Sequence, residues 1–407
     1  MLSMVEGGQD FLTSQPGGAP QYSLLLKGGR VIDPAQGISE DRDVAVSGSK
    51  IARVAKDIAE SDAKQVLDVR GKIVTPGLID LHVHVYDGVV PFGIPADPNC
   101  IAKGVTTVVD AGSAGAHTFP GFRRFVINLA STRVYALLNL SVMGMSCASF
   151  SNQWGELLDL RYANPKLAIL TIEKNRDVIL GIKIRLGRNL SGENDMQALK
   201  LAREAADAVQ LPIMVHIGGT TSPLPDILAM LKKRDIVTHC YRGGAGGVLD
   251  DKGRVLPAVF KARDGGIHFD VGHGQGSFSF DVAEKALPQD LYPGTISSDL
   301  HEYNVAGPVF DLATTLSKFM FLRMTLEQVI ERASTNAART FSFPQGFGTL
   351  REGAEADVAV FELREGNFDF IDCEGQKRVG HLKLFPAATV KSGIIYGGPT
   401  GLVPRYD

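Results

Sequence analysis

The sequence has few cysteines, no long apolar run and little net charge, and each shortage excludes a class of protein. Its 407 residues include four widely spaced cysteines and no CxxC pair, which argues against a disulfide framework and fits a reducing cytoplasm. No run of about 18 apolar residues occurs, so we expect no transmembrane helix. The net charge of −3 does not suggest nucleic acid or an anionic membrane as a partner.

The two ends of the chain differ in pattern from its middle. Residues 1–21 have neither a basic start nor a long apolar core, so they do not resemble a signal peptide. Their Gly, Gln, Ser and Pro content predicts a disordered leader, and we expect a cytoplasmic protein. Residues 22–75 and 345–407 show short alternating segments separated by Gly and Pro, which is typical of antiparallel strands. We therefore expect a small β-sandwich domain built from both chain ends.

Eight apolar, β-branched runs recur through residues 76–344, with helical patterns between them. They begin near Leu78, Val105, Val134, Ile179, Pro212, Ile236, Ile267 and Gly294. This repeat predicts a distorted (β/α)8 TIM barrel as the catalytic domain, a fold of the α/β class. The last barrel helix is expected to begin at Thr325, which forms a capping-box pattern with Gln328. A doubly wound open sheet is the alternative, but it would not explain why reactive residues end five different strands.

His82 and His84 form the most informative pair in the chain. Side chains two residues apart in a strand point to the same face, so two imidazoles at a strand end can bind one metal ion. Such a pair is a weak signal alone, but further reactive residues end later runs in the same way: Lys183, His216, His239 and Asp299. Because barrel active sites form at the C-terminal ends of the strands, the whole set predicts a binuclear metal site.

Lys183 can join such a site only after modification. An ordinary ammonium has a pKa near ~10.4, carries no free lone pair at neutral pH and would repel cations. Reaction with CO2 gives a carbamate, N6-carboxylysine, whose two oxygens can bridge two metal ions. We therefore expect N6-carboxylysine at position 183.

With these residues the chain resembles the amidohydrolase superfamily. The resemblance rests on the ordered site residues, on Gly71 to His84 (Gly-x-x-Val-Thr-Pro-Gly-Leu-Ile-Asp-x-His-x-His), on the Ser334-Thr-Asn-Ala-Ala segment and on Gly348 to Asp357. It implies two divalent metal ions, for which the ligand set favours zinc. The more buried ion would be bound by His82, His84, Lys183 and Asp299, and the more exposed one by Lys183, His216 and His239.

The expected mechanism follows from electrostatics. Two cations about 3.5–4 Å apart bridge a water molecule and lower its pKa from about 15.7 toward ~7, which supplies hydroxide at neutral pH. The exposed metal polarises a carbonyl oxygen. Asp299 acts as the general base that takes the proton of the water and returns it to the leaving group.

Two stretches bear on the substrate, Ile182-Lys-Ile-Arg-Leu-Gly and Asp270-Val-Gly-His-Gly-Gln-Gly-Ser-Phe-Ser. They resemble a branch of enzymes that remove acetyl groups from α-hydroxy carboxylates. Arg185 lies on the same strand face as Lys183 and could bind a carboxylate, or could form a salt bridge in the barrel mouth. The other candidate substrate-binding residues are His273, Gly276, Ser277 and Tyr86, with Arg242 and Asn304 as weaker ones. We thus expect a deacetylase for an acetyl ester or amide of a small α-substituted carboxylate.

Two alternatives remain. One is a cyclic amidohydrolase of the dihydroorotase or hydantoinase kind, but in dihydroorotase-like members an Arg stands two residues after the second His, where this chain has Tyr86. The other is an inactive assembly protein on the same fold, against which the complete ligand set argues. We also expect association into a homo-oligomer.

Overall fold

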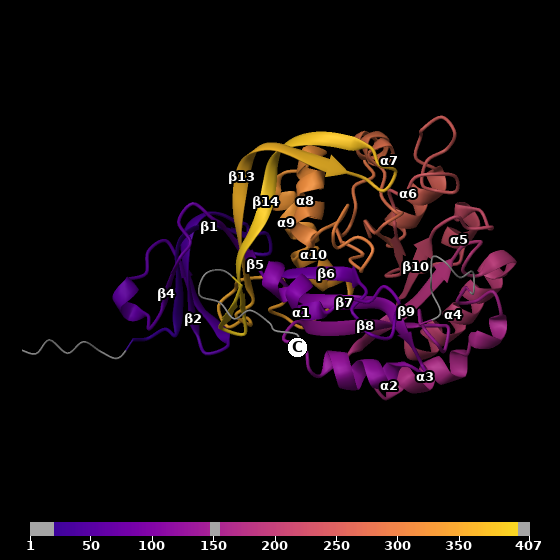
Figure 1. Cartoon of the computed structure of the whole chain (residues 1–407), viewed down its shortest axis with the longest axis horizontal. Helices are drawn as coiled ribbons and strands as arrows, with labels where there is room; N and C mark the ends of the chain where they lie inside the picture. The colour runs from indigo at the N-terminus through magenta and orange to yellow at the C-terminus, as the bar shows by residue number, and fades with distance from the viewer. Residues whose placement is uncertain (1–19, 147–154, 398–407) are drawn as a thin grey trace, which may run out of the picture.

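The computed structural model describes residues 20–146 and 155–397, and the expected leader at 1–21 lies almost entirely outside them. Seven parallel strands, each hydrogen-bonded to the next, form the barrel wall (Figure 1). They are β6 (Leu78–Val83), β7 (Val105–Gly115), β8 (Arg133–Asn139), β9 (Ile179–Leu186), β10 (Ile213–Ile217), β11 (Ile236–Thr238) and β12 (His268–Asp270).

The eighth expected run closes the barrel without forming a regular strand. Thr295 pairs with Asp270 of β12, and Leu300 pairs with Val83 of β6, both in parallel. The backbone N–H of Asp299 also donates to the carbonyl of His82 at 2.7 Å. The (β/α)8 prediction is therefore confirmed as a distorted barrel, and the distortion lies beside the expected metal ligands.

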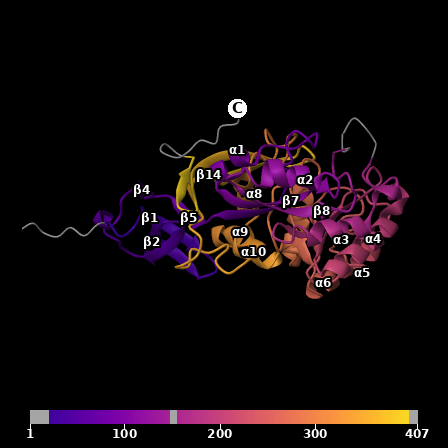
Figure 2. The same cartoon turned by 90° about the horizontal axis from the view of Figure 1, so that it is seen from below.

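Burial explains the apolar runs. Every residue of β6 and β7 is buried, as expected for parallel strands with one face on the barrel interior and the other under helices. Figure 2 shows helices from α3 to α6 along the outside of the barrel. The helices are α1 (Ala96–Asn99), α2 (Phe119–Phe122), α3 (Pro165–Glu173), α4 (Asp195–Val209), α5 (Leu224–Ala229), α6 (Pro257–Asp264), α7 (Phe280–Ala286), α8 (Leu312–Phe321), α9 (Leu326–Arg332) and α10 (Thr335–Thr340). None in the described ranges is long and apolar enough to cross a membrane.

The capping box at the start of α9 is confirmed. The side chain of Thr325 accepts a hydrogen bond from the N–H of Gln328, whose side chain accepts one from the N–H of Thr325. Two of the otherwise unpaired N–H groups at the helix start are thereby satisfied.

Both chain ends build the small β domain, as expected, and its strands form one mixed sheet. The N-terminal strands are β1 (Leu24–Asp33), β2 (Ile38–Ser47), β3 (Lys50–Ala55), β4 (Val66–Asp68) and β5 (Ile73–Pro76), and the C-terminal ones are β13 (Val358–Ile371), β14 (Lys377–Lys391) and β15 (Ile394–Tyr396). Strand β5 joins the two groups, because it pairs in parallel with β1 and antiparallel with β13.

The β13–β14 hairpin extends well beyond the small domain. It arches over α8 toward α7 (Figure 1), and Phe370 and Leu384 are part of the barrel's apolar core. The sequence patterns predicted only the first part of β13 and the last part of β14. The middle of β13, from Arg364 to Asn367, is polar and exposed, so periodicity gave no signal there.

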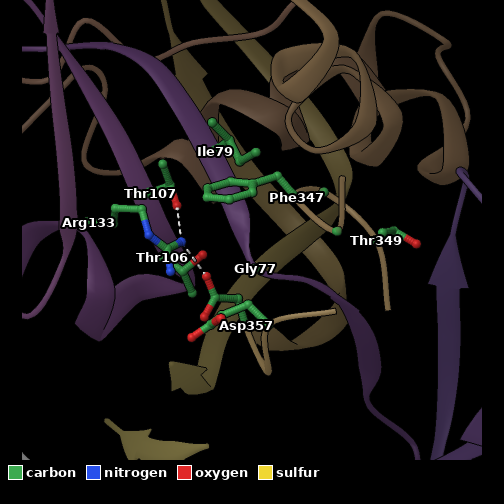
Figure 3. Close-up of a pocket in the computed structure, with 11 residues that line it drawn as sticks. Gly77, Ile79, Thr106, Thr107, Arg133, Phe347, Thr349 and Asp357 are labelled. Atoms are coloured by element: carbon green, nitrogen blue, oxygen red, sulfur yellow. Dashed lines mark hydrogen bonds and ion pairs between the residues drawn. The ribbon is translucent and has the colours of Figure 1, made fainter. Parts of the chain in front are cut away.

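At the N-terminal end of the barrel, a polar junction links barrel and small domain (Figure 3). Arg133 of β8 forms an ion pair with Asp357 at 2.7 Å, donates to Thr107 Oγ1 at 3.1 Å and lies over the ring of Phe347. The space between these residues is about 10 Å³, roughly one water molecule. The space between these residues is too small for a substrate, so they serve the contact between barrel and small domain.

Candidate active site

The two histidines of β6 and Asp299 converge at the C-terminal end of the barrel. Oδ1 of Asp299 lies 3.3 Å from Nε2 of His82 and 3.1 Å from Nε2 of His84. One ligand atom from each of the three lies within 4.8 Å of the others, and all three residues are buried. This is the geometry of a metal site, and it confirms that both imidazoles point to one face of the strand.

Backbone strain marks this side of the barrel. Asp299 has φ +51° and His239 has φ +72°, in the left-handed region that non-glycine residues seldom adopt. Such conformations cost about 1–3 kcal/mol and concentrate at functional sites. Asp80 helps to fix the strained segment, because its carboxylate accepts hydrogen bonds from the backbone N–H and the hydroxyl of Ser298.

Each histidine of the pair has its second ring nitrogen bound to a hydroxyl. Nδ1 of His82 is 2.9 Å from Oγ1 of Thr238, which donates to the buried carboxylate of Asp270 at 2.9 Å. Nδ1 of His84 is 3.0 Å from Oγ of Ser113. Since the Thr238 proton is used on Asp270, Nδ1 of His82 must donate, and this leaves the Nε2 lone pair directed at the site.

Lys183, His216 and His239 complete the cluster from neighbouring strands. The ammonium nitrogen of Lys183 lies 3.3 Å from Nε2 of His82, and the rings of His216 and His239 are 4.4 Å apart. Nδ1 of His239 bonds to the carbonyl of Gly272 at 2.7 Å, whereas its Nε2 is buried and has no hydrogen-bond partner among the described residues. A buried, unpaired ring nitrogen is costly unless a ligand such as a metal ion satisfies it.

Burial keeps the four imidazoles neutral and disfavours the charged form of Lys183. It lowers the pKa of His82, His84 and His216 well below the ordinary value, and that of His239 to about 3. It also lowers the pKa of Lys183 to about 7. Neutral imidazoles with free lone pairs beside one carboxylate are the donor set that a divalent ion requires, so the residues fit a metal.

A cavity of about 400 Å³ opens over this cluster. It is lined by Phe92, Arg185, Asn189, Gly218, Arg242, Gln275, Gly276, Ser277 and His301 in addition to the six expected ligands. The predicted substrate-binding residues Arg185, Gly276 and Ser277 thus lie on the cavity wall. Phe92, Asn189 and Gly218 were not predicted, since they lie in loops without periodic signal, whereas Gln275 belongs to the glycine-rich stretch that the sequence did indicate.

Arg185 has a partner that the sequence did not reveal. Its Nη1 lies 3.2 Å from Oε1 of the buried Glu156, so its charge is balanced within the protein. Arg242 also faces the cavity, and its Nη1 donates to the carbonyl of Ala245 at 3.1 Å. Within the described residues Arg242 makes no ion pair within 4 Å.

Three other candidates lie outside the cavity lining. The hydroxyl of Tyr86 donates to the carbonyl of Thr118 at 3.0 Å, and its ring packs on Phe122. His273 is fully buried against Lys318. The side-chain amide of Asn304 donates to the carbonyl of Asp299 at 2.8 Å, so Asn304 supports the strained segment from behind.

Comparisons with known proteins agree with this geometry. The sequence matches no protein-family model. It is 34% identical to a deacetylase of Enterococcus faecalis, over 92% of this chain and 99% of that protein. It is 33% identical to a deacetylase of Agrobacterium fabrum, over 87% of each. A crystal structure described as an adenine deaminase superposes with a TM-score of 0.85 at 34% identity, over 93% of this chain and all of that one.

The chain belongs to the amidohydrolase superfamily. The shared fold and the buried His82, His84 and Asp299 cluster make this amidohydrolase a metal-dependent hydrolase of a small molecule.

Proposed function

We propose that this amidohydrolase is a deacetylase that hydrolyses an acetyl ester or amide of a small α-substituted carboxylate, such as an O-acetyl α-hydroxy acid. The observation that carries the proposal is a cavity lined by both the metal cluster and two arginines, in a chain similar over nearly its whole length to a deacetylase. A metal site and an arginine in the wall of one cavity suit a substrate that carries both an acyl group and a carboxylate.

The proposed cofactors are two divalent ions, zinc by the chemistry of the ligands, and Lys183 as N6-carboxylysine would help to hold them. Because burial lowers the pKa of Lys183 to about 7, much of the amine is unprotonated at neutral pH. That amine can attack CO2, forming an N–C bond and releasing a proton. When bound, the ions would polarise the substrate carbonyl and acidify a water molecule.

In this proposal Asp299 is the proton carrier. Its side chain is 11% exposed and faces the cavity, and its backbone is bound to His82 and Asn304. As water adds to the acetyl carbon, its proton passes to the carboxylate of Asp299. The same proton then passes to the oxygen or nitrogen of the leaving group as that bond to the acetyl carbon breaks. Acetate and the free hydroxy acid or amine are the products.

Either arginine could bind the substrate carboxylate, and their surroundings favour Arg242. Glu156 already balances the charge of Arg185, so a carboxylate there would meet a nearby negative charge. Within the described residues Arg242 donates to the backbone carbonyl of Ala245 and forms no ion pair, although the charge of Glu374 acts to raise its pKa. In this proposal Arg242 is the main anchor, and Arg185, held by Glu156, shapes the adjoining wall. Gly276 and Ser277 could add a backbone N–H and a hydroxyl.

The first test is a substrate screen with the metal content measured. The panel contains acetyl esters of R and S α-hydroxy acids, N-acetyl D- and L-amino acids, dihydroorotate and adenine. We expect turnover of one acetyl enantiomer with about two metals per chain. Turnover of dihydroorotate or adenine alone would overturn the deacetylase proposal.

The anchor is tested by comparing an acetylated hydroxy acid with its methyl ester, which lacks the carboxylate charge. We expect Arg242→Met to raise KM for the acid by about 10- to 100-fold, the equivalent of one lost charged hydrogen-bond pair, and to change KM for the methyl ester little. Arg188→Met is the matched control, because Arg188 is exposed and precedes the cavity-lining Asn189 in the chain without lining the cavity itself. Equal effects on both probes would remove Arg242 from this role.

A further inference from the structure

Lys318 of α8 is a buried lysine that the chemistry above does not use. It is 1% exposed, and its ammonium lies 2.7 Å from Nε2 of His273, 2.9 Å from the carbonyl oxygen of Pro308 and 2.7 Å from that of Ile371. Nδ1 of His273 faces the carbonyl of Gly274 at 3.0 Å and therefore carries the ring proton, which leaves Nε2 as an acceptor. All three N–H groups of the ammonium are thus used.

Burial of this ammonium lowers the stability of the folded protein. The three acceptors of Lys318 are neutral, and Asp372 acts on its charge without a hydrogen bond to it. A buried ammonium without a hydrogen-bonded carboxylate loses its hydration without full compensation. Burial accordingly lowers its pKa to about 7. A methionine or leucine would fill the same space at lower cost, so the charge indicates a task beyond packing.

The segments that Lys318 joins surround the active site. His273 is the second residue of the 272–277 loop, and its ring stacks on Phe278, just after the loop, at 4.6 Å between centroids. Gly274, next along, lies directly against the catalytic carboxylate, because a Cβ there would be 2.3 Å from Oδ2 of Asp299. The following residues, Gln275 to Ser277, form part of the cavity wall. The loop therefore has its rear face on Lys318 and its front face on the substrate cavity.

The second segment comes from the small domain. The tip of the β13–β14 hairpin, residues 372–376, reaches the same loop and the start of α7. The N–H of Cys373 donates to the carbonyl of Phe278 at 3.1 Å, and the hydroxyl of Ser279 donates to Glu374 at 2.7 Å. Ile371, at the end of β13, supplies one of the carbonyls that Lys318 binds. Barrel loop and hairpin are thus tied at one buried point.

From this geometry we propose that Lys318 and the hairpin tip are positioning elements, which fix the 272–277 loop against Asp299 and the cavity and thereby set substrate affinity. The proposal rests on the proposed function for its substrate, and it makes the small domain part of the active-site architecture. Lys318 itself does not touch the substrate.

The test compares Lys318→Met with the wild type, using the acetylated hydroxy acid and its methyl ester. We expect KM to rise about tenfold for both probes, since a displaced wall weakens every contact it makes. Metal content should stay at the wild-type value, and Tm should fall by no more than about 5 °C, because removal of the unpaired buried charge offsets lost hydrogen bonds. Lys383→Met, on the same hairpin, is the matched control and should leave KM unchanged.

A second variant covers the case in which Lys318→Met does not fold. Glu374 is exposed, and Glu374→Ala removes its bond to Ser279 together with its charge near Arg242. The methyl ester does not depend on Arg242, so its KM reports the lost bond and should rise about threefold. Glu365→Ala, also exposed on the hairpin, should leave KM unchanged. Wild-type KM for both probes in Lys318→Met, or in Glu374→Ala if only that variant folds, would overturn the proposal. Failure of the proposed function would instead appear as absent wild-type turnover, and the same comparison would then use whichever panel substrate the wild type hydrolyses.

Discussion

Replacement of Thr238 by valine isolates the hydroxyl between His82 and Asp270. Valine has nearly the shape of threonine, and position 238 is fully buried, so packing should change little. The variant loses the contact of Nδ1 of His82 with the hydroxyl and the bond from the hydroxyl to Asp270, both 2.9 Å. His82 can then take either tautomer, and only one presents a lone pair to the metal.

The size of the expected effect follows from the hydrogen bonds that Asp270 keeps in this variant. Asp270 still accepts from Thr295 and Ser297, each at 2.7 Å, so the carboxylate keeps two of its three hydroxyl donors. We expect a loss of about 1–2 kcal/mol in the free energy of unfolding. Metal affinity should fall about 10- to 100-fold, the usual cost of losing a group that orients a metal-binding histidine.

The assay is competition for zinc between the protein and a chelator of known affinity, combined with thermal unfolding. Thr238→Ser keeps the hydroxyl and should bind metal within about threefold of the wild type. Thr107→Val removes a hydroxyl that accepts from Arg133 at the N-terminal end of the barrel (Figure 3) and should lower stability without changing metal affinity. Wild-type metal affinity in Thr238→Val would refute the proposed orientation of His82.

Three further predictions concern the reaction centre. Lys183→Ala should lose metal and activity, with partial rescue by short carboxylic acids that supply two oxygens; full activity without them would contradict the carboxylysine. Asp299→Asn should retain metal but lose about 10²- to 10⁴-fold in kcat, measured by metal analysis and steady-state kinetics; a kcat near that of the wild type would exclude Asp299 as the proton carrier. Burial holds the pKa of His239 at about 3 in the folded state against 6.5 as its ordinary value. Above pH 6.5, protonation of His239 therefore does not reduce the free energy of unfolding. As the pH falls from 6.5 toward 3, the unfolded state binds a proton that the folded state does not, and the free energy of unfolding drops by up to ~1.4 kcal/mol per pH unit. The Tm of the chelator-treated protein should decline over this window, more steeply than in His239→Asn, and parallel profiles would contradict the assignment.

Much of the fold could be predicted from local pattern. A buried parallel strand must be apolar along its length, so the runs at Leu78, Val105 and Ile179 appear in the sequence as they do in the barrel. The end of a strand can also be read from neighbouring residues, because the apolar run stops there. His82 and Asp299 could therefore be assigned to the same end of the barrel. The closing segment near Thr295 was predicted as a strand but forms only isolated bridges, because the left-handed backbone at Asp299 interrupts regular pairing.

The sequence by itself determined the order of the barrel strands, the shared β domain of the two chain ends and which residue types end each strand, since these depend on periodicities of two and about 3.6 residues. Tertiary structure alone decided the partners: Glu156 beside Arg185, Thr238 beside His82, and Lys318 behind His273. These contacts join residues 29 to 156 positions apart. Side-chain packing selects them after the backbone has closed, and no local pattern carries that information.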